Sequence, residues 1–182
     1  MRREVRLAGT GGQGLILAGI VLAEAAGLYD GKQVVQSQVY GPESRGGASR
    51  ADVIVSDRAI DYPKATTPEA LVVMSAEAYA KFGKQVKPDG VLLYDSELVQ
   101  VAAGPAQTFG LPLTRVARDE VGRAITANMI ALGALVELTG IVSKEALEAA
   151  AARRAPKGTV DINLSAIRKG YALAGAAREV VV

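Results

Sequence analysis

The sequence predicts an α/β protein, with a Rossmann-like, mostly parallel sheet covered by helices on both faces and a helical C-terminal third. Short apolar runs alternate with segments of helical periodicity through the first two thirds of the chain. These runs are continuously apolar, which is typical of parallel strands buried on both faces. The 182 residues contain no repeat and no linker rich in Pro, Gly and Ser, so residues 1–182 are expected to form a single domain.

The first element is a short strand over residues 5–8, followed by a glycine-rich turn. Over residues 13–27 apolar side chains recur at helical spacing, and Gly27 is a suitable C-terminal stop. A strand, a loop rich in turn formers and a third strand are expected next, over residues 32–38, 40–49 and 50–57.

The later elements follow from the same patterns. Residues 70–75 predict a buried strand and residues 76–86 a short amphipathic helix. The turn formers at residues 88–90 lead into a further strand over residues 91–96. Three helices are expected to complete the chain, over residues 117–138, 143–155 and 163–180.

The chain contains neither cysteine nor histidine, and their absence excludes several kinds of catalytic and metal site. Without cysteine the chain has no disulfide, no thiol nucleophile, no cysteine-bound zinc and no iron–sulfur cluster of its own. Without histidine it lacks the commonest general acid–base and a frequent metal ligand. We therefore predict neither a catalytic residue nor a metal ligand in this chain, and we do not expect it to make or break bonds alone.

The charge and hydropathy of the chain argue against two kinds of partner, nucleic acid and membrane. A net charge of +2 with scattered Lys and Arg, and only 4% aromatic residues, gives no basis for nucleic-acid binding. The N-terminal sequence MRREVRLAG passes from charges to a strand-like run without a signal-type apolar region. The most apolar helix, GLILAGIVLAEAA, contains Glu24 and is too short to span a bilayer. We expect a cytoplasmic protein that binds neither nucleic acid nor membrane.

The sequence GTGGQG between the first strand and the first helix is a candidate ligand site. Gly9, Gly11 and Gly14 fit the G-x-G-x-x-G spacing that cradles a pyrophosphate. Glycines let backbone N–H groups turn toward an anion, and the helix adds its positive N-terminal end. The alternative is a tight turn whose glycines serve close packing. The candidate residues are Gly9, Thr10, Gly11, Gly12, Gln13 and Gly14.

NAD is one ligand that such a loop can bind. A dehydrogenase needs an Asp or Glu about 20 residues past the glycines, at the end of the second strand, for the ribose hydroxyls. Here that strand ends in Gln-Ser-Gln, while Asp30 precedes it and Glu43 lies in the loop beyond it. A stand-alone NAD(P)-binding enzyme is therefore the weaker hypothesis.

A second candidate lies in the loop YGPESRGGAS. Flexible glycines beside guanidinium donors suit a phosphate or a carboxylate, whereas solvated arginines on a surface turn are the plain alternative. The loop follows the second strand and is expected next to the glycine loop, at the carboxyl end of the sheet. Its candidate residues are Ser44, Arg45, Gly46, Gly47 and Arg50.

Together, GTGGQGLILAG and QVYGPESRGGASRADVIVSD closely resemble the gamma subunit of 2-oxoacid:ferredoxin oxidoreductases. This family includes the pyruvate, 2-oxoglutarate, 2-oxoisovalerate and indolepyruvate enzymes. The resemblance continues through Tyr62-Pro63, ALVVMSAEAYAKF, NMIALGALVELTGIVS and NLSAIRKGY, so it covers nearly the whole chain.

The resemblance implies a subunit of a thiamine-diphosphate-dependent complex. Such a complex converts a 2-oxoacid, coenzyme A and oxidised ferredoxin to acyl-CoA, carbon dioxide and reduced ferredoxin. Thiamine diphosphate, magnesium and the [4Fe–4S] clusters are implied on partner subunits (alpha, beta and, where present, a ferredoxin-like delta subunit) and none on this chain. The chain is then inactive alone and meets ferredoxin only indirectly.

Coenzyme A, the implied co-substrate, carries a pyrophosphate and a ribose 3′-phosphate. We assign the backbone amides between Gly11 and Gly14 to one phosphate and Arg45 or Arg50 to another. An assembly module whose glycine loop only packs is the third hypothesis.

Three other polar residues have plainer interpretations. Asp95 is expected in a solvated turn at a strand end. Asn128, which is polar within an apolar helix, is expected to bond a loop or the partner, in a packing role rather than as a ligand contact. Tyr40 is expected to form a wall of the site or of an interface.

Overall fold

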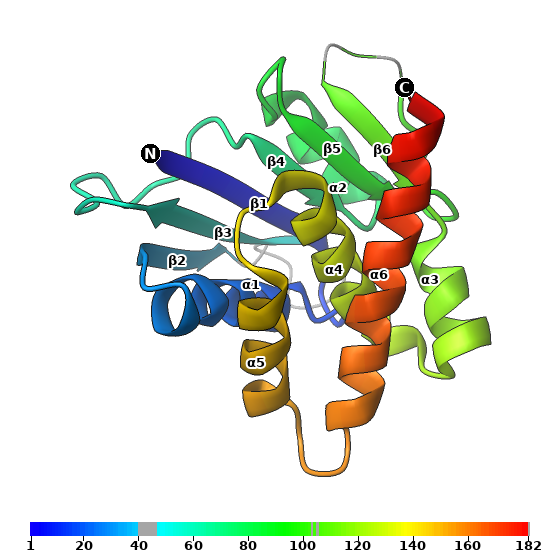
Figure 1. The fold of residues 1–182 in the computed structure, drawn as a ribbon. Helices are drawn as coiled ribbons and strands as arrows, with labels where there is room; N and C mark the ends of the chain where they lie inside the picture. Colours follow the sequence, from blue (N-terminus) through cyan, green and yellow to red (C-terminus); the bar gives the residue numbers. More distant parts are fainter. Residues whose placement is uncertain (40–46, 103, 105, 182) are drawn as a thin grey trace.

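The computed structural model describes residues 1–39, 47–102, 104 and 106–181. Among these residues six strands form one sheet in the order β2-β3-β1-β4-β5-β6, with β1 in its interior and β2 and β6 at its edges (Figure 1). The strands are β1 (Arg2–Thr10), β2 (Gln33–Val39), β3 (Ala48–Ser56), β4 (Ala70–Val73), β5 (Val91–Asp95) and β6 (Gln107–Leu111).

One strand runs against its neighbours. β1, β4, β5 and β6 pair in parallel, whereas β3 is antiparallel to both β1 and β2. Only residues 40–47 separate β2 from β3, and parallel neighbours need a crossover of about a dozen residues or more. The predicted α/β class is confirmed, and the sheet is mixed because of β3.

β6 was not predicted from the sequence. Only Phe109 and Leu111 of this edge strand are buried, and its exposed residues interrupt the apolar run that marks the other strands. An edge strand with so short an apolar signal resembles a loop in sequence.

Helices cover both faces of the sheet, as predicted. Their bounds are α1 (Leu15–Glu24), continued by a π-helix (Ala25–Tyr29); α2 (Ala76–Phe82), continued by a 3-10 turn (Gly83–Gln85); α3 (Leu113–Val116), continued by a π-helix (Ala117–Val121); a 3-10 turn (Ala124–Thr126); α4 (Ala127–Thr139); α5 (Lys144–Arg154); and α6 (Val160–Val181). The C-terminal third is therefore helical, as the sequence indicated.

Two predicted helix boundaries are wrong. The single helix expected over 117–138 is broken at Gly122, whose φ of 87° is left-handed, and α4 begins only at Ala127. Gly27 does not stop the first helix, because the π-helix carries the chain to Tyr29 and the left-handed turn follows at Gly31.

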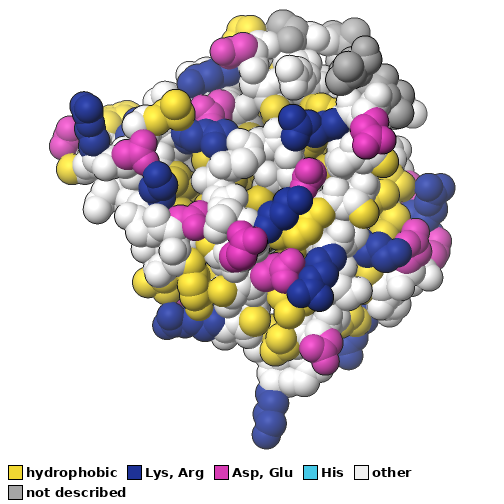
Figure 2. Space-filling model, viewed as in Figure 1, with side chains coloured by type: hydrophobic (Ala, Val, Ile, Leu, Met, Phe, Trp, Pro, Cys, Tyr) yellow, Lys and Arg dark blue, Asp and Glu magenta, His cyan; other side chains and the backbone are white. Residues whose placement is uncertain are grey.

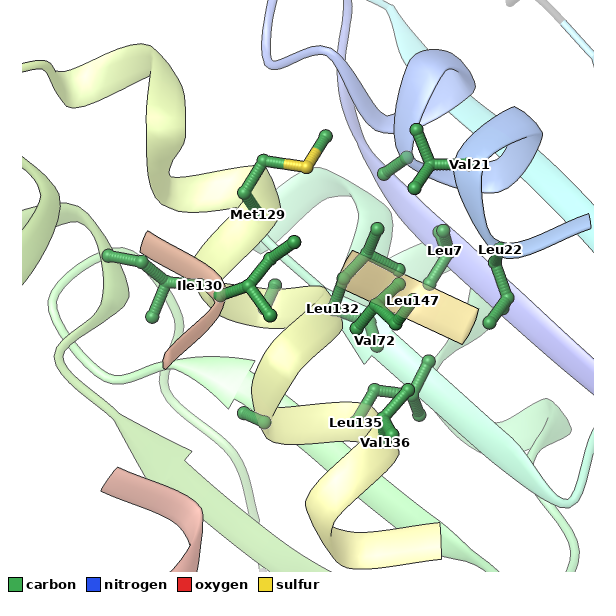
Figure 3. Packing of buried hydrophobic residues seen from close by; sticks show 14 of the residues in the cluster. Leu7, Val21, Leu22, Val72, Met129, Ile130, Leu132, Leu135, Val136 and Leu147 are labelled. Atoms are coloured by element: carbon green, nitrogen blue, oxygen red, sulfur yellow. The ribbon is translucent and has the colours of Figure 1, made fainter. Parts of the chain in front are cut away.

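The main core lies between the sheet and the layer formed by α1, α4, α5 and α6. Figure 3 shows Leu7 of β1 and Val72 of β4 packed toward Leu132 and Leu135 of α4. On the opposite face α2 covers a smaller cluster that includes Phe82.

Glycines bring the axes of α4 and α6 into close contact. A Cβ atom at Gly133 would overlap the carbonyl oxygen of Ile167. A Cβ atom at Gly170 would overlap the carbonyl oxygen of Ile130 and lie 2.7 Å from the nitrogen of Ala134. Backbone therefore packs on backbone at this crossing, and any side chain larger than hydrogen would separate the helices.

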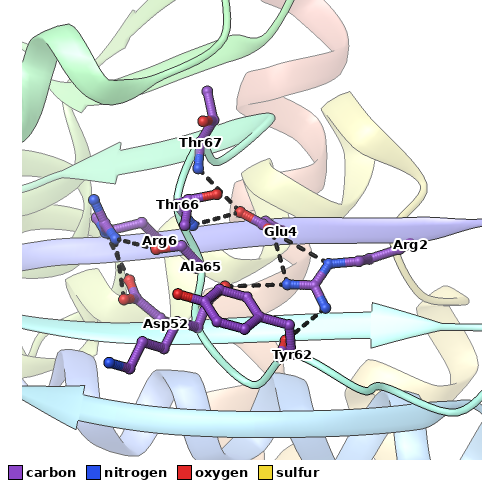
Figure 4. Close-up of polar contacts among 9 residues, drawn as sticks. Arg2, Glu4, Arg6, Asp52, Tyr62, Ala65, Thr66 and Thr67 are labelled. Atoms are coloured by element: carbon purple, nitrogen blue, oxygen red, sulfur yellow. Dashed lines mark hydrogen bonds and ion pairs between the residues drawn. The ribbon is translucent and has the colours of Figure 1, made fainter.

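Residues 57–69 form a strap on the same face of the sheet as α2. The strap crosses the part of that face that α2 does not cover. Alternate charged side chains of β1 hold the backbone of this strap: Arg2, Glu4 and Arg6 (Figure 4). These contacts range from 2.7 Å, for Arg2 to the carbonyl of Tyr62, to 3.2 Å, for Arg6 to the carbonyl of Ala65. The charges that interrupt the first strand in sequence thus have backbone partners.

The face formed by α4, α5 and α6 carries charges of both signs side by side (Figure 2). The ion pairs there are Lys144–Glu137, Arg168–Glu148 and Lys169–Glu120. Among the residues that the structure describes, no helix combines the length and hydropathy needed to cross a bilayer.

Candidate functional site

The glycine loop joins the carboxyl end of β1 to the start of α1. Gly12 and Gly14 have φ of 92° and 73°, a left-handed conformation that glycine adopts without strain. Gly11 and Gly12 are exposed, and a Cβ atom on either would meet nothing within 4 Å. The loop backbone is therefore accessible to a ligand, beside a helix start whose first N–H groups have no intrahelical acceptor.

Gln13 braces the loop from within. Its Oε1 atom accepts a hydrogen bond from the Thr10 amide at 2.8 Å, and its Nε2 atom donates to the Met74 carbonyl at 2.8 Å. The side chain thereby ties the loop to the end of β4. A Cβ atom at Gly9 would clash with Gln13 Oε1, so this close contact requires glycine.

Asn128, near the start of α4, holds the other end of the loop. Its Nδ2 atom donates to the Gly14 carbonyl at 3.0 Å, and the residue is only 4% exposed. The sequence analysis expected Asn128 to bond a loop or the partner, and its contact with Gly14 is a bond to a loop.

Two hollows flank the loop, and Ile125 lines both. One, of about 280 Å³, is bounded by Gly12 and Gln13 and by Leu98, which follows β5. The other, of about 150 Å³, is mostly apolar and lies between α1 and the connection of α5 to α6. The exposed faces of Leu17, Leu98 and Ile125 make the surroundings of the loop apolar.

Arg154 lies at the rim of the smaller hollow and is paired with Glu24. Its Nε atom donates to Glu24 Oε1 at 2.7 Å. This hydrogen bond and the guanidinium charge lower the pKa of Glu24, against the opposing effect of burial. The charges of Arg154 and Glu24 therefore offset each other, while Arg123 adds a positive charge to the lining of the hollow.

The described end of the second loop lies beside the glycine loop. Ala48, the first residue of β3, pairs with Thr10, and the Ser49 hydroxyl donates to the Gly9 carbonyl at 3.4 Å. Gly47, which directly precedes β3, is buried. The reversed strand β3 rather than β2 makes this contact with β1. Residues 40–46 of the predicted loop lie outside the described residues, and they include the candidates Tyr40, Ser44, Arg45 and Gly46.

Arg50 points to the α2 face of the sheet. Its Nε atom lies 3.4 Å from Asp52 Oδ2, and its guanidinium stacks over the Phe82 ring with 5.4 Å to the centroid. Arg6 stacks on the same ring at 5.5 Å and shares the same carboxylate. Within the described part of the chain, two arginines thus share one buried aspartate.

The arrangement around β2 disfavours NAD. Because β3 stands between β1 and β2, the end of β2 is two strand spacings, roughly 10 Å, from β1. Asp30, the acid at about the right sequence distance, accepts hydrogen bonds from the Ser143 amide and hydroxyl, each at 2.7 Å. Neither geometry matches a ribose-binding acid at the end of a neighbouring strand.

Asp95 was expected in a solvated turn, and this prediction is wrong. The residue is 0% exposed, and its carboxylate accepts from the Glu97 amide at 3.1 Å and the Thr114 amide at 2.9 Å. It closes the turn after β5 and joins it to the start of α3. Burial of a carboxylate with several N–H donors indicates a structural role.

Sequence reasoning missed the Arg6–Asp52 pair on the α2 face. Two signals were present, since Arg6 lies between Val5 and Leu7 in the apolar part of β1, and Asp52 lies between Ala51 and Val53 in that of β3. Charges in such positions need a partner, because an unpaired buried charge is costly. Among the described residues no group of His, Cys, Asp and Glu is arranged to hold a metal ion.

Comparisons with known proteins agree with this architecture. The family model described as pyruvate ferredoxin/flavodoxin oxidoreductase matches residues 4–173. The chain is 49% identical over 177 residues to 2-oxoglutarate synthase subunit KorC of Methanocaldococcus jannaschii, covering 96% of this chain and 95% of that one.

Two solved structures extend the comparison. The gamma subunit of keto/oxoacid ferredoxin oxidoreductase from Geobacter sulfurreducens matches with a TM-score of 0.90 and 49% identity, over 97% of this chain and 98% of that one. The 2-oxoglutarate:ferredoxin oxidoreductase of Magnetococcus marinus, solved with 2-oxoglutarate, coenzyme A and succinyl-CoA bound, matches with a TM-score of 0.85 and 26% identity. That match covers 96% of this chain but 31% of the longer one. The chain therefore belongs to the pyruvate ferredoxin/flavodoxin oxidoreductase family and is a gamma-type subunit of a 2-oxoacid:ferredoxin oxidoreductase.

Proposed function

We propose that this subunit contributes backbone amides of its glycine loop to a phosphate of coenzyme A in the assembled oxidoreductase. The observation that supports this most is the accessible backbone at Gly11 and Gly12, just before α1, where a Cβ atom on either residue would meet nothing within 4 Å. Amide N–H groups at a helix start attract anions through both hydrogen bonding and the helix dipole. Coenzyme A supplies such anions.

The rest of the predicted site keeps the same assignment. Ser44, Arg45, Gly46, Gly47 and Arg50 are proposed to receive a second phosphate of coenzyme A. The pairing of Ala48 with Thr10 supports this, because it brings the end of the second loop next to the first. Arg50 would need to reach past Asp52 to do so, so we rank Arg45 ahead of it.

We further propose 2-oxoglutarate as the substrate of the complex. The 49% identity to a 2-oxoglutarate synthase subunit supports this. Alpha and beta subunits are proposed to hold thiamine diphosphate and magnesium. A ferredoxin-like delta subunit is proposed to share the [4Fe–4S] clusters and to pass electrons to ferredoxin. Residues 1–182 are proposed to form a single gamma-type domain. The complex is proposed to assemble in the cytoplasm.

Gly11→Ala tests the assignment in the assembled complex. The added methyl meets no protein atom within 4 Å, so folding and assembly should be retained while the approach of a phosphate is blocked. We expect the KM for coenzyme A to rise about tenfold, the equivalent of about 1.4 kcal/mol, with kcat at saturating coenzyme A little changed. Gly175→Ala, which also adds a methyl to open space but on α6, is the matched control.

Arg45→Ala and Arg50→Ala extend the test to the second loop. A raised KM for coenzyme A in either complex supports the assignment. An unchanged KM in all three variants would leave the subunit as an assembly module whose glycine loop only packs. Initial rates with 2-oxoglutarate, pyruvate, 2-oxoisovalerate and indolepyruvate test the substrate separately.

A further inference from the structure

We propose that Asn128 is a positioning residue, which fixes the direction of the amide donor at the start of α1. This inference rests on the proposed function of the glycine loop for its consequence in catalysis. The contact itself stands on geometry, since Asn128 Nδ2 donates to the Gly14 carbonyl at 3.0 Å from a buried position.

The Gly14 carbonyl is held by two donors. The Ala18 amide donates to it at 3.0 Å, which is the first hydrogen bond of α1, and Asn128 supplies the second. An sp² oxygen accepts near its two lone-pair directions, so two donors from different elements restrict the carbonyl in its plane.

Fixing this carbonyl also fixes the next N–H group. The Gly14–Leu15 peptide unit is planar and trans, so the Leu15 N–H points opposite to the Gly14 carbonyl. The carbonyl points along α1, and the N–H therefore points out of the helix start. Within the described part of the chain, Leu15 N–H donates to no protein acceptor. Asn128 thus aims an amide donor that it does not touch.

The position of Asn128 shows that this contact is not ordinary helix capping. It is the second residue of α4, two positions past the N-cap Thr126, and the N-cap is where a short polar side chain accepts hydrogen bonds from its own helix. Asn128 instead uses its amide as a donor toward a residue 114 positions earlier in the chain. A Cβ atom at Gly14 would lie 2.5 Å from Asn128 Nδ2, so this approach requires glycine in addition to the φ of 73°.

Two side-chain amides, of Gln13 and Asn128, connect the two ends of the loop to different elements. Gln13 reaches the end of β4, and Asn128 belongs to α4. The loop is therefore preorganised by side-chain amides, and a ligand need not order it on binding.

Asn128→Asp and Asn128→Ala both remove the donor to the Gly14 carbonyl, and they differ in charge and volume. Asn128→Asp keeps the volume, and the helix dipole at the first turn of α4 offsets part of the cost of the buried carboxylate. It replaces a donor with an oxygen that faces the Gly14 carbonyl oxygen, so the peptide should turn away. Asn128→Ala removes the donor without repulsion. Asn163→Asp is the matched control, because Asn163 Nδ2 donates to the Thr159 carbonyl at 2.8 Å in α6.

Two measurements on the assembled complex test the role of Asn128. Amide hydrogen exchange over residues 10–18 should accelerate roughly 5- to 10-fold in Asn128→Asp, less in Asn128→Ala, and not in Asn163→Asp. The KM for coenzyme A should rise by a similar factor in the same order, with kcat at saturation retained.

The outcomes distinguish the two levels of the argument. Unchanged exchange in both Asn128 variants would overturn the positioning role, whatever the KM. Faster exchange with an unchanged KM for coenzyme A would uphold the positioning role and overturn the coenzyme A assignment. An unchanged KM in Gly11→Ala would overturn that assignment independently. Faster exchange with a raised KM supports both.

Discussion

Arg6 on β1 and Asp52 on β3 form a buried ion pair with two hydrogen bonds, Nε to Oδ1 at 2.6 Å and Nη2 to Oδ2 at 3.1 Å. The two residues are directly paired across the antiparallel strands and are 2% and 4% exposed. Arg50 approaches the same carboxylate from the solvent side. The pair therefore fixes the register of the reversed strand against the centre of the sheet.

Removal of either partner of this ion pair should lower the free energy of unfolding, and the two losses should differ. Asp52→Asn leaves Arg6 and Arg50 together over Phe82 without a carboxylate, whereas Arg6→Met leaves Asp52 with Arg50. We expect each to lower the free energy of unfolding by about 3–5 kcal/mol, with Asp52→Asn the larger loss. Denaturant unfolding of the two variants checks this, and equal or reversed losses would argue against a compensating role for Arg50.

Glycine at the crossing of α4 and α6 should be indispensable. Gly133→Ala and Gly170→Ala place a methyl group against the backbone of the facing helix, and overpacking of this kind costs about 1–3 kcal/mol or more. Gly175→Ala on the same helix meets nothing within 4 Å and should instead stabilise by about 0.5–1 kcal/mol through helix propensity. Thermal unfolding of the three variants gives the comparison, and a similar Tm for all three would contradict this packing.

Ser143 should stabilise two elements at once. Its hydroxyl accepts from the Ala146 amide at 3.1 Å as the N-cap of α5, and donates to Asp30 Oδ1 at 2.7 Å. Ser143→Ala should therefore cost about 1–2 kcal/mol, at the upper end for a cap, because Asp30 loses a donor too. Asp30→Asn in the same unfolding assay separates the parts, since it leaves the cap intact.

Asp57 should give the fold a contribution that acid removes. Hydrogen bonds from Lys32 and from the N-terminal amine, with their charges, lower the pKa of Asp57 from 3.8 to about 2. A carboxylate with a depressed folded-state pKa stabilises above its unfolded value and loses this effect as the pH falls through the folded one. The Tm advantage of the wild type over Asp57→Asn should thus be constant above about pH 4 and shrink toward pH 2. An advantage that is undiminished at pH 2 would contradict the assignment.

Much of the fold could be predicted because its signals are local. The glycine loop, the N-cap at Ser143 and the strands over β1, β3 and β4 all lie where the sequence indicated. The direction of β3 could also have been inferred, since residues 40–47 are too few for a crossover. β6 and the break at Gly122 could not, because their apolar patterns are short or appear continuous with the next helix.

The candidate site was harder to predict because its contacts are distant in sequence. Arg6 and Asp52 are 46 positions apart, and Asn128 and Gly14 are 114 apart. Periodicity and spacing describe neighbours along one element, so they carry no information on such pairs. The sequence predicted which loop to examine, and the three-dimensional structure shows which side chains hold it.

The central place of β1 also affects how the chain is made. β1 precedes every other described strand, yet its sheet partners begin only at Ala48 and Ala70. At about 5–20 residues per second, both edges of β1 stay unpaired for several seconds during synthesis. An open strand edge readily pairs with another chain. Nascent chains that stall before Ala70 should therefore aggregate, and production of this subunit should depend on translation speed and on chaperones that cover β1.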